Sequence, residues 1–93
     1  MERELTILNK LGLHARPAAE FVRCVRRYNK CEIIIRKDGA EYSADSILEV
    51  LSANLDCGSQ MTLIADGQNA AKAVDELAAL LLQFRAQEQI EDC

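Results

Sequence analysis

Gly12–Pro17 reads Gly-Leu-His-Ala-Arg-Pro, and it holds the only histidine and the only proline of the 93-residue chain. Before this stretch, residues 2–8 alternate between apolar and polar side chains, which is typical of a strand. After it, apolar residues recur every three to four positions, which is typical of a helix. Proline is tolerated in the first turn of a helix, because its missing N–H would have no intrahelical partner there. Pro17 therefore predicts that a helix begins beside His14.

A helix start gives His14 a chemistry of its own. Unpaired backbone N–H groups and the positive end of the helix dipole favour a neutral ring and attract anions. A neutral imidazole is a nucleophile, and the guanidinium of Arg16 suits phosphate oxygens. The pattern predicts that His14 accepts a phosphoryl group, which Arg16 and the backbone N–H groups of Ala15 and Arg16 stabilise. The alternative is that His14 only caps the helix or faces solvent, the commoner role of a single histidine.

Residues 9–18, Asn-Lys-Leu-Gly-Leu-His-Ala-Arg-Pro-Ala, resemble the active-site signature of the HPr family, the histidine-containing phosphocarriers of the phosphoenolpyruvate phosphotransferase system. Asp45–Leu48 resembles the regulatory phosphorylation segment of that family, and Asp66-Gly67 before the last predicted helix also fits. The likeness in length and order of elements runs from about Met1 to Gln87. It implies one HPr-like domain over residues 1–87, and we expect residues 88–93 to form a flexible acidic tail.

This resemblance implies a carrier without independent turnover, and thus not an enzyme. His14 would receive the phosphoryl group from phosphorylated enzyme I and pass it to enzyme II acceptors of the IIA type. Phosphorylation of Ser46 would add regulation, with an HPr kinase/phosphorylase and a transcriptional regulator as further partners. Ile47, Leu48 and Leu51 fall where the partner-binding patch of the family lies.

Two other functions stay open. The protein could be a regulatory binding module that acts through docking, either in the nitrogen-related branch, which the Asn-Lys-Leu-Gly run also resembles, or as a co-regulator phosphorylated on Ser46. Asp45 stands where the sugar branch often has a lysine, and its negative charge argues against recognition of Ser46 by a kinase. The third possibility is a small structural domain in which His14 is only a cap.

Ser46–Glu49 matches a capping box, in which the serine and glutamate side chains each accept a hydrogen bond from the backbone N–H of the other residue. It predicts a helix over residues 47–53. That helix carries more apolar side chains than one narrow face can bury, so we expect part of the Ile47, Leu48 and Leu51 set to be exposed for docking. A slightly wider core face is the alternative.

The formal net charge of −4 argues against nonspecific nucleic-acid binding. Basic residues nevertheless gather around the first predicted helix, and Arg23 and Arg26 there suit an acidic protein partner. A solvated helix face is the alternative for these outer arginines. The four cysteines show no Cys-x-x-Cys spacing, and the chain has no second histidine, so neither a metal site, nor a cofactor, nor a disulfide framework is indicated. With no apolar leader or spanning segment, we expect a cytoplasmic monomer with reduced thiols and no membrane insertion.

The whole pattern predicts the order β-α-β-β-α-β-α. Strands are expected at residues 2–8, 31–37, 40–43 and 60–66, and helices at residues 15–28, 47–53 and from about 70 onward. This order is typical of an α+β fold with a four-stranded, mostly antiparallel sheet and helices on one face, and the resemblance adds the HPr-like open-faced β-sandwich topology. Cys24 falls toward the polar side of the first helix, so we expect it to be exposed.

Overall fold

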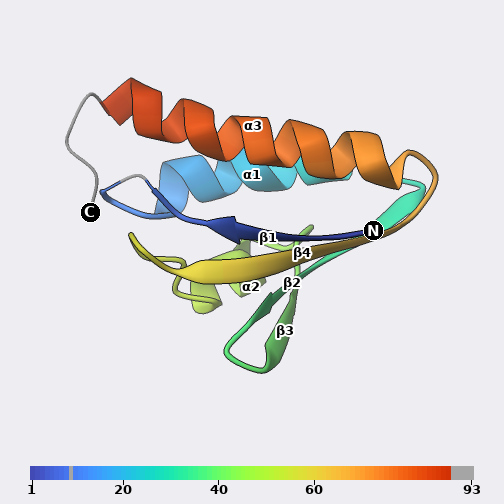
Figure 1. Cartoon of the computed structure of the whole chain (residues 1–93), viewed down its shortest axis with the longest axis horizontal. Coiled ribbons are helices and arrows are strands. Elements are labelled where there is room, and N and C mark those ends of the chain that lie inside the picture. The colour runs from blue at the N-terminus through green and yellow to red at the C-terminus, as the bar shows by residue number, and fades with distance from the viewer. Residues whose placement is uncertain (9, 89–93) are drawn as a thin grey trace.

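The computed structural model describes residues 1–8 and 10–88, apart from the side chain of residue 88. The predicted order of elements is confirmed (Figure 1). The elements are β1 (Glu2–Thr6), α1 (Ala15–Arg26), β2 (Cys31–Lys37), β3 (Ala40–Ser43), α2 (Ile47–Ser52), β4 (Gln60–Gly67) and α3 (Ala70–Glu88). Most of the predicted acidic tail, residues 89–93, lies outside the described residues, as does Asn9 of the signature.

The four strands form one antiparallel sheet in the order β1-β4-β2-β3. The side chains of β4 alternate, because Met61, Leu63 and Ala65 are buried while the residues between them are partly exposed. On β2, Ile35 pairs with Leu63 and Ile33 pairs with Ala65, so these buried side chains share one face of the sheet. That face carries the core.

Helices α1 and α3 lie side by side along the sheet, and α2 packs beside α1 against β3 (Figure 1). One face of α3 is apolar and buried at Ala73, Val74, Leu77, Leu81 and Phe84. Full burial of each aliphatic or aromatic side chain stabilises the fold by roughly 1.5–3 kcal/mol before entropy is counted. Two helices pressed on one sheet face therefore fix the direction of α1, which carries the predicted site at its start.

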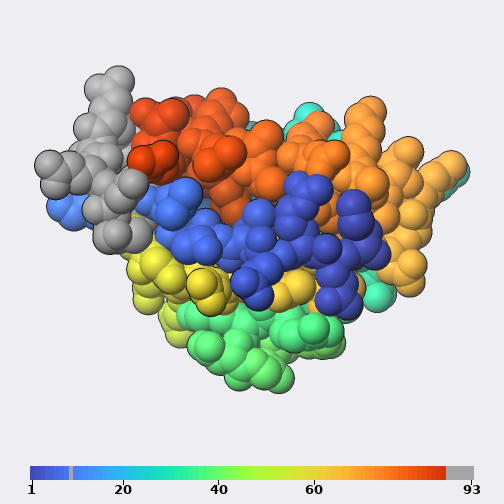
Figure 2. Space-filling model, viewed as in Figure 1, coloured from blue at the N-terminus to red at the C-terminus, as the bar shows by residue number. Residues whose placement is uncertain are grey.

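The β2–β3 hairpin extends away from the two long helices (Figure 1). Figure 2 shows β1 across the front and the β2–β3 hairpin projecting below it. At the hairpin tip, Asp38 and Gly39 have positive φ values of 53° and 82°, as a tight two-residue hairpin turn requires. Within the described ranges, no helix is long and apolar enough to cross a membrane.

The expectation that Cys24 is exposed is wrong. The residue is only 2% exposed, because α3 packs over that side of α1, and its Sγ donates a hydrogen bond to Glu76 Oε2 at 2.9 Å. Burial, together with the hydrogen bond to Glu76, raises the pKa of the Cys24 thiol to about 11. The expectation of reduced thiols is also wrong for Cys57, which is disulfide-bonded, whereas Cys24 and Cys31 are free.

The raised pKa of Cys24 predicts an alkaline loss of stability. The folded protein keeps the thiol proton up to about pH 11, whereas the unfolded chain releases it near the ordinary value of 9.0. The free energy of unfolding should therefore fall as the pH rises between these values, by about 1–2 kcal/mol from this group. Urea unfolding at several pH values checks this, with Cys24→Ala as the comparison. An equally steep alkaline decline in the Cys24→Ala protein would contradict it.

Candidate functional site

The loop that leads to His14 is held by a close backbone contact. Gly12 has φ +66°, and a Cβ atom there would lie 2.6 Å from the Leu55 carbonyl oxygen. The next residue, Leu13, is buried and donates its N–H to the same oxygen at 2.9 Å. Only glycine allows both the positive φ and this approach. The loop is thereby fixed to the segment that follows α2, and it delivers His14 to the start of α1.

His14 is the N-cap residue of α1, so the predicted helix start is confirmed. Its backbone is extended, with φ −82° and ψ −170°, and its carbonyl accepts the Ala18 N–H at 2.9 Å. The imidazole makes no capping hydrogen bond, and the residue is exposed. Pro17 and Ala18 are buried beneath it, which anchors the first turn of the helix. Within the described residues the ring therefore makes no hydrogen bond at the helix end, and a capping role does not account for it.

Two backbone donors face outward beside this ring. Among the described residues, the N–H groups of Ala15 and Arg16 have no hydrogen-bond partner, Pro17 has no N–H, and the N–H of Ala18 is already used. The guanidinium of Arg16 is exposed and makes no ion pair or hydrogen bond within the described ranges. Two free amides and one free guanidinium next to an exposed imidazole can hold an anion loosely.

The two predicted docking arginines differ from each other. Arg23 is exposed and makes no hydrogen bond or ion pair with the part of the chain that the structure describes. Arg26, in contrast, donates from Nε to the Asp45 carbonyl oxygen at 3.0 Å. Arg26 thus links the end of α1 to the turn before α2, and it carries a structural contact as well as a charge.

The predicted apolar set on α2 is unevenly exposed. Leu48 is 75% exposed and Leu51 is 36% exposed, whereas Ile47 is half-buried against the core. Sequence reasoning missed Leu11, which is 62% exposed in the loop before His14. The signal in the sequence that could have indicated this exposed residue is an apolar side chain in a short loop that contains a glycine.

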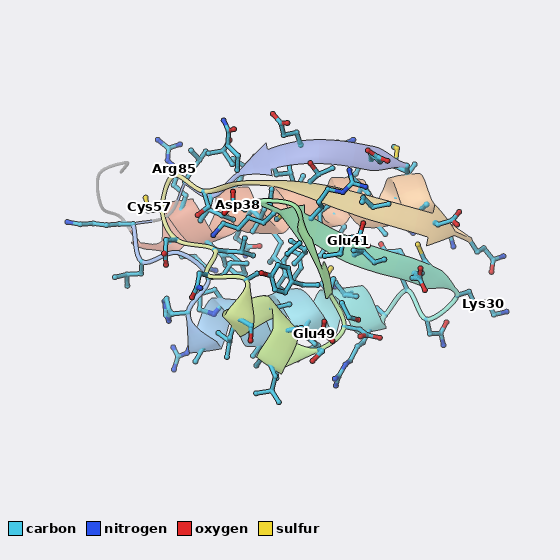
Figure 3. All side chains as sticks on the ribbon, turned by 90° about the horizontal axis from the view of Figure 1, so that it is seen from below. Lys30, Asp38, Glu41, Glu49, Cys57 and Arg85 are labelled. Atoms are coloured by element: carbon cyan, nitrogen blue, oxygen red, sulfur yellow. The ribbon has the colours of Figure 1, made fainter. Side chains whose placement is uncertain are left out.

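Ser46 is the N-cap of α2, but only half of the predicted capping box forms. Its Oγ accepts the Glu49 N–H at 3.4 Å. The Glu49 carboxylate accepts the Ser43 N–H at 3.0 Å, and the Ser46 N–H instead donates to the Ser43 carbonyl at 3.3 Å. The Glu49 carboxylate therefore bonds the end of β3 and not the backbone of Ser46. Figure 3 labels Glu49 on α2. Ser46 is half-buried at this junction.

The sequence matches the family model described as the PTS HPr component phosphorylation site over residues 1–83. The chain belongs to the HPr family. Its curated relatives include an HPr-like protein Crh from Halalkalibacterium halodurans, 38% identical over 87% of this chain and 95% of the relative. They also include the phosphocarrier protein NPr of Shewanella violacea, 38% identical over 87% of this chain and 88% of the relative.

Solved structures agree with this HPr-family fold. The phosphocarrier protein HPr from Bacillus anthracis superposes with a TM-score of 0.82 at 36% identity, covering 86% of this chain and 94% of that one. An HPr dimer from Thermoanaerobacter tengcongensis gives a TM-score of 0.71 at 34% identity, covering 85% of this chain and 90% of that one. Because a dimer occurs among the neighbours, the monomeric state of this chain stays a prediction.

Replacing Gly12 with alanine should destabilise the HPr-family fold at the loop before His14. The added Cβ would meet the Leu55 carbonyl and would also have to adopt a positive φ. We expect a loss of about 2–4 kcal/mol in the free energy of unfolding. Gly39→Ala is the matched control, because Gly39 has φ +82° but nothing within 4 Å of the added atom, so its cost should be about 1 kcal/mol. Chemical denaturation measures both variants. Equal losses in the free energy of unfolding would show that the contact with the Leu55 carbonyl does not set the cost at Gly12.

Proposed function

We propose that this HPr-family protein is a phosphocarrier that accepts a phosphoryl group on His14 from phosphorylated enzyme I and passes it to IIA-type acceptors. The observation that carries the proposal is the exposed imidazole at the start of α1, which makes no capping hydrogen bond and precedes two N–H groups without a partner among the described residues. Membership of the HPr family and likeness to proteins named as phosphocarriers support it.

The proposed step is a displacement at phosphorus. An imidazole nitrogen of His14 donates its lone pair to form a new N–P bond, while the N–P bond to the donor histidine breaks and its electron pair returns to that ring. In the second transfer a nucleophile of the acceptor protein attacks the phosphorus. The N–P bond to His14 then breaks, and its electron pair returns to the His14 ring. The N–H groups of Ala15 and Arg16 and the Arg16 guanidinium would share the charge of the phosphoryl oxygens.

The sparse contacts at the site suit a carrier. A carrier must bind its phosphoryl group weakly enough to release it, so extensive stabilisation of the phosphorylated state would slow the second transfer. His14 and Arg16 are both exposed, and Pro17 removes one of the amides that a helix start would otherwise offer. The site thus provides a few contacts at the surface and leaves access for a partner protein.

The first test is phosphorylation by phosphoenolpyruvate and a bacterial enzyme I. Wild-type protein should gain one acid-labile phosphoryl group by mass spectrometry, and His14→Ala should gain none. Arg16→Ala should be phosphorylated about tenfold more slowly, the lower end of what a hydrogen bond to a charged group contributes at an exposed position. Arg36→Ala is the control, since Arg36 lies on β2 and pairs with Glu41. Equal labelling of His14→Ala and wild type would refute the proposal.

A regulatory role through docking is the second candidate, and two observations favour it. Solved structures similar to this chain include Crh, described as the catabolite repression HPr of Bacillus subtilis, and Ser46 caps the helix that carries the exposed Leu48. A phosphate on Ser46 would add negative charge between the Asp45 and Glu49 carboxylates. Acidic partners would then be repelled from the apolar side chains of α2.

This second role predicts a charge effect at one serine. Ser46→Asp should weaken docking to enzyme I by roughly three- to tenfold, because like charges near an interface are unfavourable by about 1 kcal/mol. Ser52→Asp is the matched control at the other end of α2, where the serine hydroxyl bonds the Leu48 carbonyl. Calorimetric titration measures both. Equal effects of the two substitutions would argue against a specific role for Ser46.

A further inference from the structure

A second polar pocket lies where α1 ends and α3 begins. It has a volume of about 330 Å³ and is lined by residues 27–30 and by residues around the start of α3. α1 contains 12 residues, so this pocket is about 18 Å from His14 at the usual helical rise. Figure 3 shows Lys30 at one end of the molecule and Cys57, near the His14 loop, at the other. The pocket is therefore separate from the proposed phosphoryl site.

The residues that line this pocket carry a net positive charge, whereas the whole chain carries a net negative charge. Arg27, Lys30 and Lys72 line it together with a single carboxylate, Glu76, which leaves an excess of two positive charges on a protein of net charge −4. Glu76 is already engaged, since it accepts hydrogen bonds from Arg27 at 3.0 Å and from the Cys24 thiol at 2.9 Å. The ammonium groups of Lys30 and Lys72 make no hydrogen bond or salt bridge with any described residue, although the charge of Lys72 also helps to lower the pKa of Glu76. Two cations are left to bind a ligand.

The walls of the pocket are held together before any ligand arrives. The Gln68 N–H donates to the Lys30 carbonyl at 3.1 Å, which joins the loop after α1 to the turn before α3. Gly67, with φ +126°, lets the two backbones touch, because a Cβ there would lie 2.5 Å from the Lys30 oxygen. The side-chain amides of Asn29 and Asn69 extend from these two joined segments. Preorganisation of this kind lowers the entropic cost of binding.

We infer that this pocket binds a small phosphate monoester whose remaining part carries hydroxyl groups. A phosphate monoester is close to dianionic at neutral pH, which matches the excess of two positive charges. The amide side chains of Asn29, Gln68 and Asn69 can each donate to and accept from hydroxyl groups. The volume falls at the lower end of the range for small-molecule sites, so the ligand is of the size of a phosphorylated polyol.

Amide chemical shifts of the full chain, titrated with glycerol 3-phosphate, test the inference. We expect saturable shifts in residues 27–30 and 68–76 at lower ligand concentrations than any shifts in residues 14–18, where an anion would be held only loosely. Inorganic phosphate should bind more weakly because it lacks the hydroxyl-bearing part, and glycerol should produce no shifts. Added salt should weaken binding, since the attraction is between exposed charges.

Substitution of the free cations completes the test. The double variant Lys30→Gln/Lys72→Gln should bind glycerol 3-phosphate about tenfold more weakly, the summed effect of two exposed ion pairs. Arg16→Gln is the control, because it removes a cation from the His14 site and should leave the affinity of the pocket unchanged. Shifts confined to residues 14–18, no saturable shifts, or equal affinity of the double variant and wild type would each overturn the inference.

Discussion

The structure depends on one backbone contact, the approach of Gly12 to the Leu55 carbonyl. It fixes the loop before α1 to the chain that follows α2, and the burial of Pro17 then sets the first helical turn. Because both constraints act on the backbone, the His14 side chain is left without a structural task. An exposed imidazole at a helix start is thus a consequence of how the loop is packed, and the unpartnered N–H groups beside it follow from the same geometry.

The arginines at the two ends of α1 differ in their interactions. At its start, Arg16 is exposed, follows His14 by two residues and makes no ion pair or hydrogen bond with the described part of the chain. At its end, Arg27 is committed to Glu76, whose pKa is lowered by the hydrogen bond from Cys24 and by the Arg27 charge. The same helix therefore carries the proposed phosphoryl site at its start and joins a second basic region through α3. An acidic protein can carry both because each needs only a few local cations.

The elements and the position of His14 could be predicted from local patterns, since strand alternation, the Asp38-Gly39 turn and Pro17 each act over a few residues. Features that depend on distant packing could not. Cys24 lies on the polar side of α1 by sequence, but α3 covers it. Glu49 was expected to bond the Ser46 N–H, yet the end of β3 offers the Ser43 N–H instead. The polar pocket joins segments about forty residues apart, so no local motif marks it.

The central claim is that the phosphoryl group resides on His14 within reach of the helix-start amides. Phosphorus NMR of the isotopically labelled protein, after reaction with phosphoenolpyruvate and enzyme I, tests it most directly when combined with amide shifts. We expect a phosphoimidazole signal correlated with the ring protons of His14, together with large shifts of the Ala15 and Arg16 amides. A phosphorus signal correlated with another residue, or a phosphorylated His14 that leaves both amides unmoved, would contradict it.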